Sequence, residues 1–198
     1  MATGILVAVL LLVLGIGWLS IAAYNGLVSL RNRYKNAFQQ IDVQLKRRHD
    51  LVPNLVSVAR AYLKHEHDTL DDVTRARTAA VHASEQARAT PGNAAAMGAL
   101  GAAEGALGSA LGRLMVLSES YPELKAQASL AELSEDLRST DNRIAFARQH
   151  YNDAVMKYDD KRQAFPTLLV ANSLGFAEAA KLEVVSDERE RQAPRVEL

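Results

Sequence analysis

The sequence contains no cysteine, and this absence excludes disulfide scaffolds, thiol nucleophiles and cysteine-based metal sites. Proline and glycine are scarce, with 5 and 11 copies in 198 residues, and 48% of the residues are hydrophobic, which argues against extensive disorder. The chain also lacks a net charge, since 23 Lys and Arg balance 23 Asp and Glu. A neutral chain has no overall electrostatic attraction for nucleic acid, so nucleic acid is not expected among its partners.

Charged side chains are missing from the whole N-terminal part, where the first one is Arg31. The 19 uncharged residues from Ile5 to Ala23 would form a helix of roughly 28 Å, close to the hydrocarbon thickness of a bilayer. Such a helix satisfies its own backbone hydrogen bonds and can cross lipid. Residues 1–23 are therefore predicted to be a transmembrane anchor in the lipid bilayer. The residues taken to represent this anchor, from its start to its end, are Ile5, Leu12, Trp18 and Ala23.

A cleaved signal peptide is the alternative interpretation of this segment. Ser20 and Ala22 could form a small-x-small cleavage site, but no positively charged side chain precedes the hydrophobic stretch. Basic residues follow the stretch, and this asymmetry predicts a cytoplasmic body below a single membrane span. The membrane-proximal basic residues, which could also meet anionic headgroups, are Arg31, Arg33 and Lys35.

From Tyr24 onward, apolar residues recur at spacings of three and four, which predicts helices and no strands. The breaks between helices are expected at residues 49–53, 90–93 and 120–123. At the first break, Asp50 is a suitable N-cap and Pro53 is tolerated in a first helical turn. The last helix is expected to end before Pro166. Four long helices with short connections predict an all-α, antiparallel four-helix up-and-down bundle over residues 24–166.

The residues after Pro166 form two further segments. Residues 167–185 are apolar at helical spacing, and they could either cap the bundle or lie on the membrane surface. Residues 186–198 are mostly charged and are predicted to form a flexible tail.

Several short stretches occur in the order typical of one protein family. The first stretches are YNGLVSLRN at residues 24–32 and IDVQLKRRHDLVPNL at residues 41–55. The later ones are LMVLSESYPELK at residues 114–125, NRIAFAR at residues 142–148 and YNDAV at residues 151–155. In these motifs and their order, the chain resembles the LemA family over residues 5–183.

The resemblance implies a single-span protein of the bacterial cell membrane whose helical domain has no established enzymatic activity. Family members are linked with membrane organisation and with HtpX-type membrane peptidases. The resemblance therefore favours a non-enzymatic adaptor or scaffold in membrane organisation or remodelling, with protein partners and no cofactor. The alternative is a sensor or regulator of a membrane-bound peptidase. The chain departs most from the family pattern between Pro91 and Gly112, which is rich in Ala and Gly.

No arrangement of catalytic or metal-binding residues supports an enzyme. The run from His65 to Asp68 contains metal-ligand residue types, but helical positions two apart point about 200° apart, so its two histidines would not share an ion. The glycines between residues 98 and 112 lack the lysine and the preceding strand of a phosphate-binding loop. Catalytic, cofactor-binding and metal-binding residues are therefore all predicted to be absent.

These glycines follow a spacing of three and four and form one stripe on the predicted third helix. Each costs about 1 kcal/mol relative to Ala in an isolated helix, so we expect close contact with another helix to compensate. The contact could be tight packing within one chain or a seam between copies in a homo-oligomer. The stripe consists of Gly98, Gly101, Gly105, Gly108 and Gly112.

Charged residues in the family-like stretches suggest an ion pair between helices. We expect Arg143, on the fourth predicted helix, to pair with Asp42 or Asp50 and so fix the register of the bundle. Solvated positions on the helix flanks are the alternative.

Overall fold

A computed structural model of the chain describes residues 1–63 and 65–184. The helices in this part are α1 (Ala2–Tyr62), α2 (His67–Ala89), α3 (Ala94–Glu119), α4 (Pro122–Lys125), α5 (Ala128–Gln163) and α6 (Thr167–Ser173). No strand occurs among the described residues, and the all-helical prediction is confirmed.

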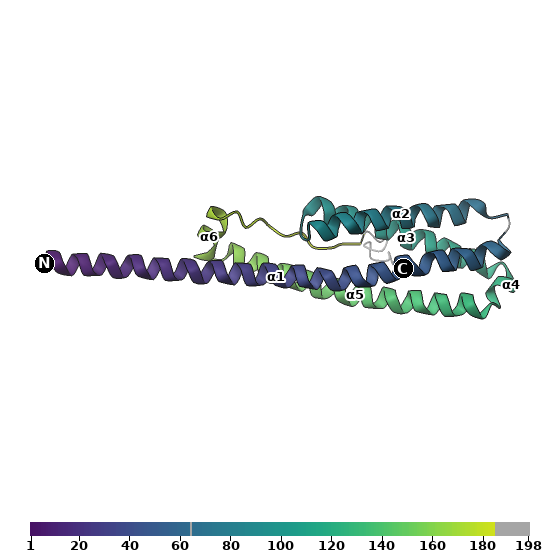
Figure 1. Cartoon of the computed structure of the whole chain (residues 1–198), viewed down its shortest axis with the longest axis horizontal. Coiled ribbons are helices and arrows are strands. Elements are labelled where there is room, and N and C mark those ends of the chain that lie inside the picture. Colours follow the sequence, from purple (N-terminus) through teal and green to yellow (C-terminus); the bar gives the residue numbers. More distant parts are fainter. Residues whose placement is uncertain (64, 185–198) are drawn as a thin grey trace, which may run out of the picture.

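The long helices pack closely in two pairs, α1 with α5 and α2 with α3 (Figure 1). α1 also contacts α2, and α6 packs on both α1 and α5. The N-terminal part of α1 extends beyond all the other helices, whereas the rest of α1 lies inside the packed body (Figure 1). The molecule is thus an elongated helical body with one helix projecting from one end.

α1 is one continuous helix of 61 residues, so the break predicted at residues 49–53 is wrong. Pro53 lies inside this helix, where it has no N–H to donate to the carbonyl of His49. The Nε–H of Arg77, on α2, donates to this carbonyl instead, at 2.7 Å. Because the acceptor that proline leaves free is satisfied from a neighbouring helix, α1 continues to Tyr62, and the turn falls between Tyr62 and His67.

Two hydrophobic clusters follow one another along the body. The first contains Phe38, Tyr151 and Tyr158, and the Phe38 and Tyr151 rings meet edge to face with centroids 5.7 Å apart. The second contains Leu55 and Leu114. Each cluster takes residues from α1, α2, α3 and α5, so the apolar stripes read from the sequence supply the core.

The turn between α2 and α3 follows its sequence signal closely. Gly92 has φ +88°, which L side chains rarely adopt, and the side-chain oxygen of Asn93 accepts the N–H of Ala96 at 3.0 Å as the N-cap of α3. The next connection is longer than expected, because Pro122 begins the short α4 and α5 starts only at Ala128.

After α6 the chain reverses direction and leaves the helical state. Gly175 has φ +68°, and residues 176–184 then run in a non-helical course back along the body (Figure 1). Residue 185 and the predicted tail at residues 186–198 lie outside the described residues.

Candidate membrane-proximal site

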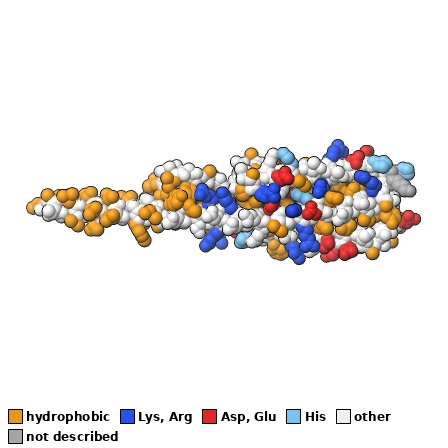
Figure 2. Space-filling view, viewed as in Figure 1, with side chains coloured by type: hydrophobic (Ala, Val, Ile, Leu, Met, Phe, Trp, Pro, Cys, Tyr) orange, Lys and Arg blue, Asp and Glu red, His pale blue; other side chains and the backbone are white. Residues whose placement is uncertain are grey.

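The projecting part of α1 presents hydrophobic side chains to its surroundings on every side. Trp18 is 71% exposed, and Ile5 and Leu12 are exposed as well. Figure 2 shows hydrophobic side chains covering this part of the helix, with charged side chains confined to the body. The packed body begins at Ala23, which is only 7% exposed. The predicted anchor therefore coincides with the segment that the body leaves uncovered.

Both α1 and α3 are long and apolar enough to cross a membrane by length and composition. They differ in what surrounds their apolar residues. The most hydrophobic window of α1 is 0% buried, whereas Leu100, Leu107 and Leu114 of α3 are core residues. The hydrophobicity of α3 is thus accounted for by packing, and that of the projecting part of α1 is not.

An apolar groove lies where α1 leaves the body, between α1 and α6. It has a volume of about 550 Å³, and none of its lining side chains is charged. The groove is lined by Ile16, Ser20, Ile21, Tyr24, Leu169, Val170, Ser173 and Leu174. On the opposite side of α6, Thr167 and Ala171 are buried against the body. From the sequence, residues 167–185 are expected either to cap the bundle or to lie on the membrane surface. The buried face of α6 packs on the body.

The three predicted membrane-proximal basic residues lie in different surroundings. The guanidinium of Arg31 stacks over the ring of Phe176, 5.0 Å from its centroid, and Phe176 also meets Tyr24 edge to face. Arg33 and Lys35 are exposed on the first turns of α1 inside the body.

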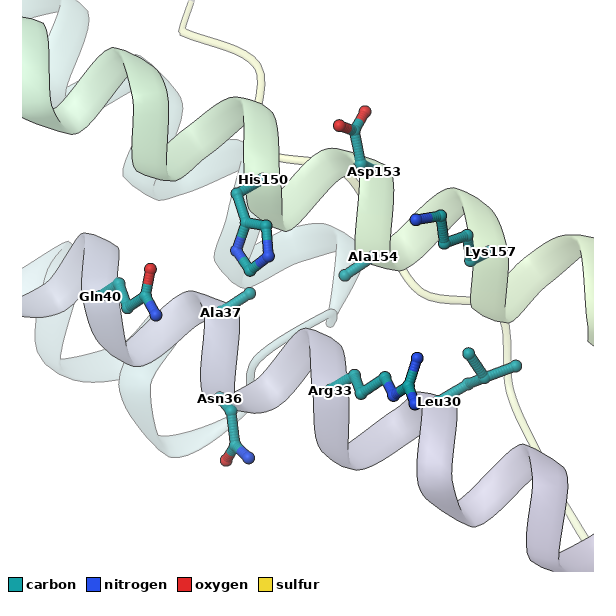
Figure 3. A pocket seen from close by; sticks show the side chains of 9 residues that line it. All are labelled: Leu30, Arg33, Asn36, Ala37, Gln40, His150, Asp153, Ala154 and Lys157. Atoms are coloured by element: carbon teal, nitrogen blue, oxygen red, sulfur yellow. The ribbon is translucent and has the colours of Figure 1, made fainter.

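Arg33 lines a pocket of about 280 Å³ between α1 and α5. Arg33 lies on the α1 side of this pocket next to Leu30, and Lys157 and Asp153 lie on the α5 side (Figure 3). Two cations next to one carboxylate leave this part of the surface positive.

A buried polar layer separates the two hydrophobic clusters. Arg48 and His49 of α1 and Glu104 of α3 are all buried. One Glu104 oxygen accepts from Nη1 of Arg48 at 2.8 Å, and the other accepts from Nε2 of His49 at 2.7 Å. Nε of Arg48 lies 3.2 Å from Oδ1 of Asp141 on α5. The layer thus joins three helices and satisfies both oxygens of a buried carboxylate.

Asp141 sits at the rim of this layer. Burial raises the pKa of its carboxyl above the ordinary value, and the nearby Glu104 raises it further, while the positive charge of Arg48 acts in the opposite direction. Its ionised form is therefore less favourable in the folded chain than in the unfolded one.

The ion pair predicted for Arg143 is not the one that the structure contains. Asp42 lies within 3.8 Å of Arg88 and accepts a hydrogen bond from Ser84 at 3.3 Å, both on α2. Asp42 and Asp50 both line a groove between α1 and α2. Arg143 instead lines a groove between α1 and α5, separate from the pocket that contains Arg33. The prediction fails because the two acids face α2, whereas Arg143 lies on the other flank of α1.

The glycine stripe on α3 does not face a single neighbour. A Cβ at Gly101 would overlap the backbone carbonyl of Glu183, so the close approach comes from the C-terminal segment instead of a helix. A Cβ at Gly108 would stand 3.4 Å from the guanidinium of Arg48. Gly98 and Gly112 are exposed, and a Cβ at either position would meet no neighbouring residue within 4 Å.

The segment of residues 176–184 is held to α5 by side chains that bind its backbone. The amide of Asn152 accepts the N–H of Leu182 at 2.9 Å and donates to its carbonyl at 3.2 Å. The hydroxyls of Tyr151 and Tyr158 donate to two further carbonyls, at 2.7 and 2.8 Å. Burial raises the pKa of both tyrosines, so the hydroxyls stay protonated as donors. Ala180 extends the attachment by donating to the carbonyl of Gly92 at 2.8 Å.

The run from His65 to Asp68 spans the α1–α2 turn and the start of α2, so the helical geometry assumed for it holds only in part. Glu66 accepts a hydrogen bond from the hydroxyl of Tyr121 at 3.1 Å, and this bond raises the pKa of Tyr121. Among residues 1–63 and 65–184, no group of three or more His, Cys, Asp or Glu is placed to hold a metal ion.

The buried polar layer was missed by sequence reasoning, although one signal pointed to it. Glu104 is the only charged residue between Ala94 and Gly112, on a helix that is otherwise apolar. A lone carboxylate in such a helix, if it is buried, needs a cation or hydrogen-bond donors as partners, and Arg48 lies one turn beyond the core residue Leu45.

Comparison with known proteins identifies the family. A family model described as the LemA family matches residues 37–198. Two magnetosome proteins of Paramagnetospirillum magneticum, MamQ 1 and MamQ 2, are each 27% identical to the chain over 171 residues. The matches cover 79% of this chain and 63% of the length of each relative. Since the family match extends over most of the sequence and agrees with the motifs, the chain belongs to the LemA family.

Proposed function

We propose that this protein is a non-enzymatic, single-pass membrane scaffold whose body acts in membrane organisation or remodelling. One observation carries the proposal: the exposed apolar segment and the central helix of the body are the same continuous helix, α1. A helix without a flexible joint transmits the orientation of its membrane span to everything packed on it. The anchor would thus hold the body at a defined angle to the bilayer.

We further propose that the four long helices work as one antiparallel, up-and-down bundle on the cytoplasmic side. Support comes from the short connections after α1 and α2 and from the polar layer, whose hydrogen bonds and ion pairs join α1, α3 and α5. The relatives support membrane organisation as the process, because two of them are magnetosome proteins.

A non-enzymatic role fits the way in which the buried ionisable groups are used. Arg48, His49 and Glu104 bind one another, so their hydrogen-bonding capacity serves the body itself. Self-association is part of the proposal, since Gly98 and Gly112 leave shallow positions on the outer side of α3 that a second copy can approach.

Reconstitution of the purified full-length chain into liposomes tests the proposal. We expect the chain to float with the vesicles after an alkaline wash and to change vesicle shape in electron micrographs. Replacement of Leu12 and Ile16 by lysine provides the control and should abolish flotation, because each charge at the centre of a span costs about 2.5–3.5 kcal/mol.

Crosslinking in native membranes tests the partners. Capture of further copies of the chain supports the scaffold. Capture of one membrane peptidase in stoichiometric amount would instead favour the alternative, in which the body regulates that enzyme. A wild-type chain that stays in the soluble fraction would contradict both.

A further inference from the structure

Three large hydrophobic side chains are exposed together at the end of the body from which α1 projects. Phe165 is 81%, Leu169 60% and Leu174 58% exposed. They flank or belong to α6, and we call them the α6 collar. Because Thr167 and Ala171 already bury the opposite side of α6 against the body, the collar is not required for packing within the chain.

The collar shares its surroundings with the projecting helix. Leu169 and Leu174 line the apolar groove whose other wall is formed by Ile16, Ile21 and their neighbours on α1. Both walls of a groove lie in the same medium. If lipid surrounds Ile16 and Ile21, it also reaches Leu169 and Leu174.

Charged side chains begin directly beyond the groove, on the side of the body. Lys161 lies against Gly26, and Arg31 stacks on Phe176. Gly26 is about half a helical turn and Arg31 about two turns past Tyr24, the last groove residue on α1, which corresponds to roughly 3 and 10 Å along the axis. The ion-paired Arg162, Asp159 and Glu178 lie at the same level. An apolar zone followed at this distance by charged side chains matches the order of hydrocarbon and polar headgroups at a bilayer surface.

We propose that the α6 collar is a docking surface for the bilayer, inserted in the interfacial layer beside the span. The inference rests on the proposed membrane anchor and adds a second point of attachment to it. A single helix is free to rotate and tilt in a membrane, whereas a helix with a lateral apolar contact at the surface is held in one orientation. The collar thereby sets the angle at which the body leaves the membrane.

The sole tryptophan of the chain, Trp18, allows a direct test by fluorescence quenching. The full-length protein is reconstituted in phosphatidylcholine vesicles with and without brominated acyl chains. Trp18 reports the anchor in the wild type. On a Trp18→Phe background, Leu169→Trp and Phe165→Trp each report the collar. Val116→Trp is the matched control, because Val116 is 71% exposed but lies near the distal end of α3.

We expect brominated chains to reduce the emission of Trp18 and of both collar probes at least twofold, and to leave the Val116→Trp emission unchanged. Quenching of Trp18 without quenching of either collar probe would overturn the inference while leaving the anchor intact. A collar probe that is blue-shifted but not quenched would show that protein covers the collar, with the same consequence. Absence of quenching at Trp18 would overturn the anchor itself. Circular dichroism confirms that each variant keeps its helix content.

Discussion

Single residues decide how the middle of the body is held together. The polar layer of Arg48, His49 and Glu104 interrupts the hydrophobic core between Leu45 and Val52 of α1. Burying an ion pair gains little net stability over a hydrophobic contact, because desolvation offsets the attraction. The polar layer instead fixes the register of α3 against α1, because an axial shift between these helices would leave a buried charge without its partner.

Removal of one charge from this layer should therefore be costly. We expect Glu104→Met to lower the free energy of unfolding by up to about 3–5 kcal/mol, because Arg48 then keeps only the half-exposed Asp141 as an anionic partner and His49 loses its acceptor. The double variant Arg48→Met with Glu104→Met should recover most of this loss. Urea unfolding of the body in detergent micelles, followed by circular dichroism, measures both. Equal midpoints for Glu104→Met and the wild type would contradict the role of the layer.

Asp141 makes the stability of the body depend on pH. Because its pKa is raised in the folded chain, the folded state binds the proton more tightly than the unfolded state. The stabilisation that comes from protonated Asp141 is fully present below the pKa of about 4 that this carboxyl has in the unfolded chain. It is lost as the pH rises through the higher pKa of the folded chain. We expect Asp141→Asn to reduce this decline in stability. Melting temperatures measured across the acidic range test this expectation, with Asp160→Asn at an exposed position as the charge-matched control. The same pH dependence in both variants would show that Asp141 does not cause the decline.

Two glycines of the same stripe should respond to alanine in opposite directions. A methyl group at Gly101 would overlap the carbonyl of Glu183, so Gly101→Ala should destabilise the body or detach the C-terminal segment. Gly112 has open space, so Gly112→Ala should stabilise α3 by up to about 1 kcal/mol. Thermal melts of the two variants provide the comparison. A stabilised Gly101→Ala would show that the segment does not lie against α3.

At the scale of elements, the continuity of α1 depends on α2. Proline in a helix interior typically kinks or ends the helix, yet here the carbonyl that it leaves free is satisfied by Arg77. The interaction between Pro53 and Arg77 can be isolated by a double-mutant cycle. Alanine at position 53 restores the N–H that donates to the carbonyl of His49 within the helix.

We expect Arg77→Met to cost about 1–3 kcal/mol in the wild-type chain, because it leaves the partly buried His49 carbonyl without a protein donor. The same change on the Pro53→Ala background should cost less, since the helix then supplies its own donor. Urea unfolding of the four chains measures the coupling. An identical cost in both backgrounds would mean that Arg77 stabilises the body through other contacts.

The elements also show what could be predicted from the sequence. Apolar spacing predicted the helices that supply the core, because helix periodicity is a local property, but it gave no signal for the buried alanines Ala80, Ala83 and Ala87 of α2. The break at Pro53 and the Arg143 pair were wrong, because the donor to His49 and the partners of Asp42 come from α2. The contact at Gly101 could not be anticipated either, since its partner is a non-helical segment that is distant in the sequence. Local patterns identified helices and faces, but not which faces meet.

At the scale of the whole molecule, the continuous α1 couples two environments. Its apolar part is exposed along most of its length and meets α6 only near the body, and its inner part is the helix on which α2, α5 and α6 pack. For the proposed anchor, the orientation across the membrane depends on the charges next to the apolar segment. Arg31, Arg33 and Lys35 follow the apolar segment, and no charged side chain precedes it. Basic residues that flank a membrane span tend to stay on the cytoplasmic side. The three basic residues after the apolar segment therefore predict a cytoplasmic body.

The absence of cysteine makes this orientation testable with single-cysteine variants. Ala126→Cys places a thiol in the exposed turn at the distal end of the body, and Thr3→Cys places one before the span. With a membrane-impermeant maleimide on intact spheroplasts, we expect Thr3→Cys to react and Ala126→Cys to react only after permeabilisation. The unmodified chain controls for background labelling. Reaction of Ala126→Cys in intact spheroplasts would place the body outside, and any partner would then have to be sought on that side of the membrane.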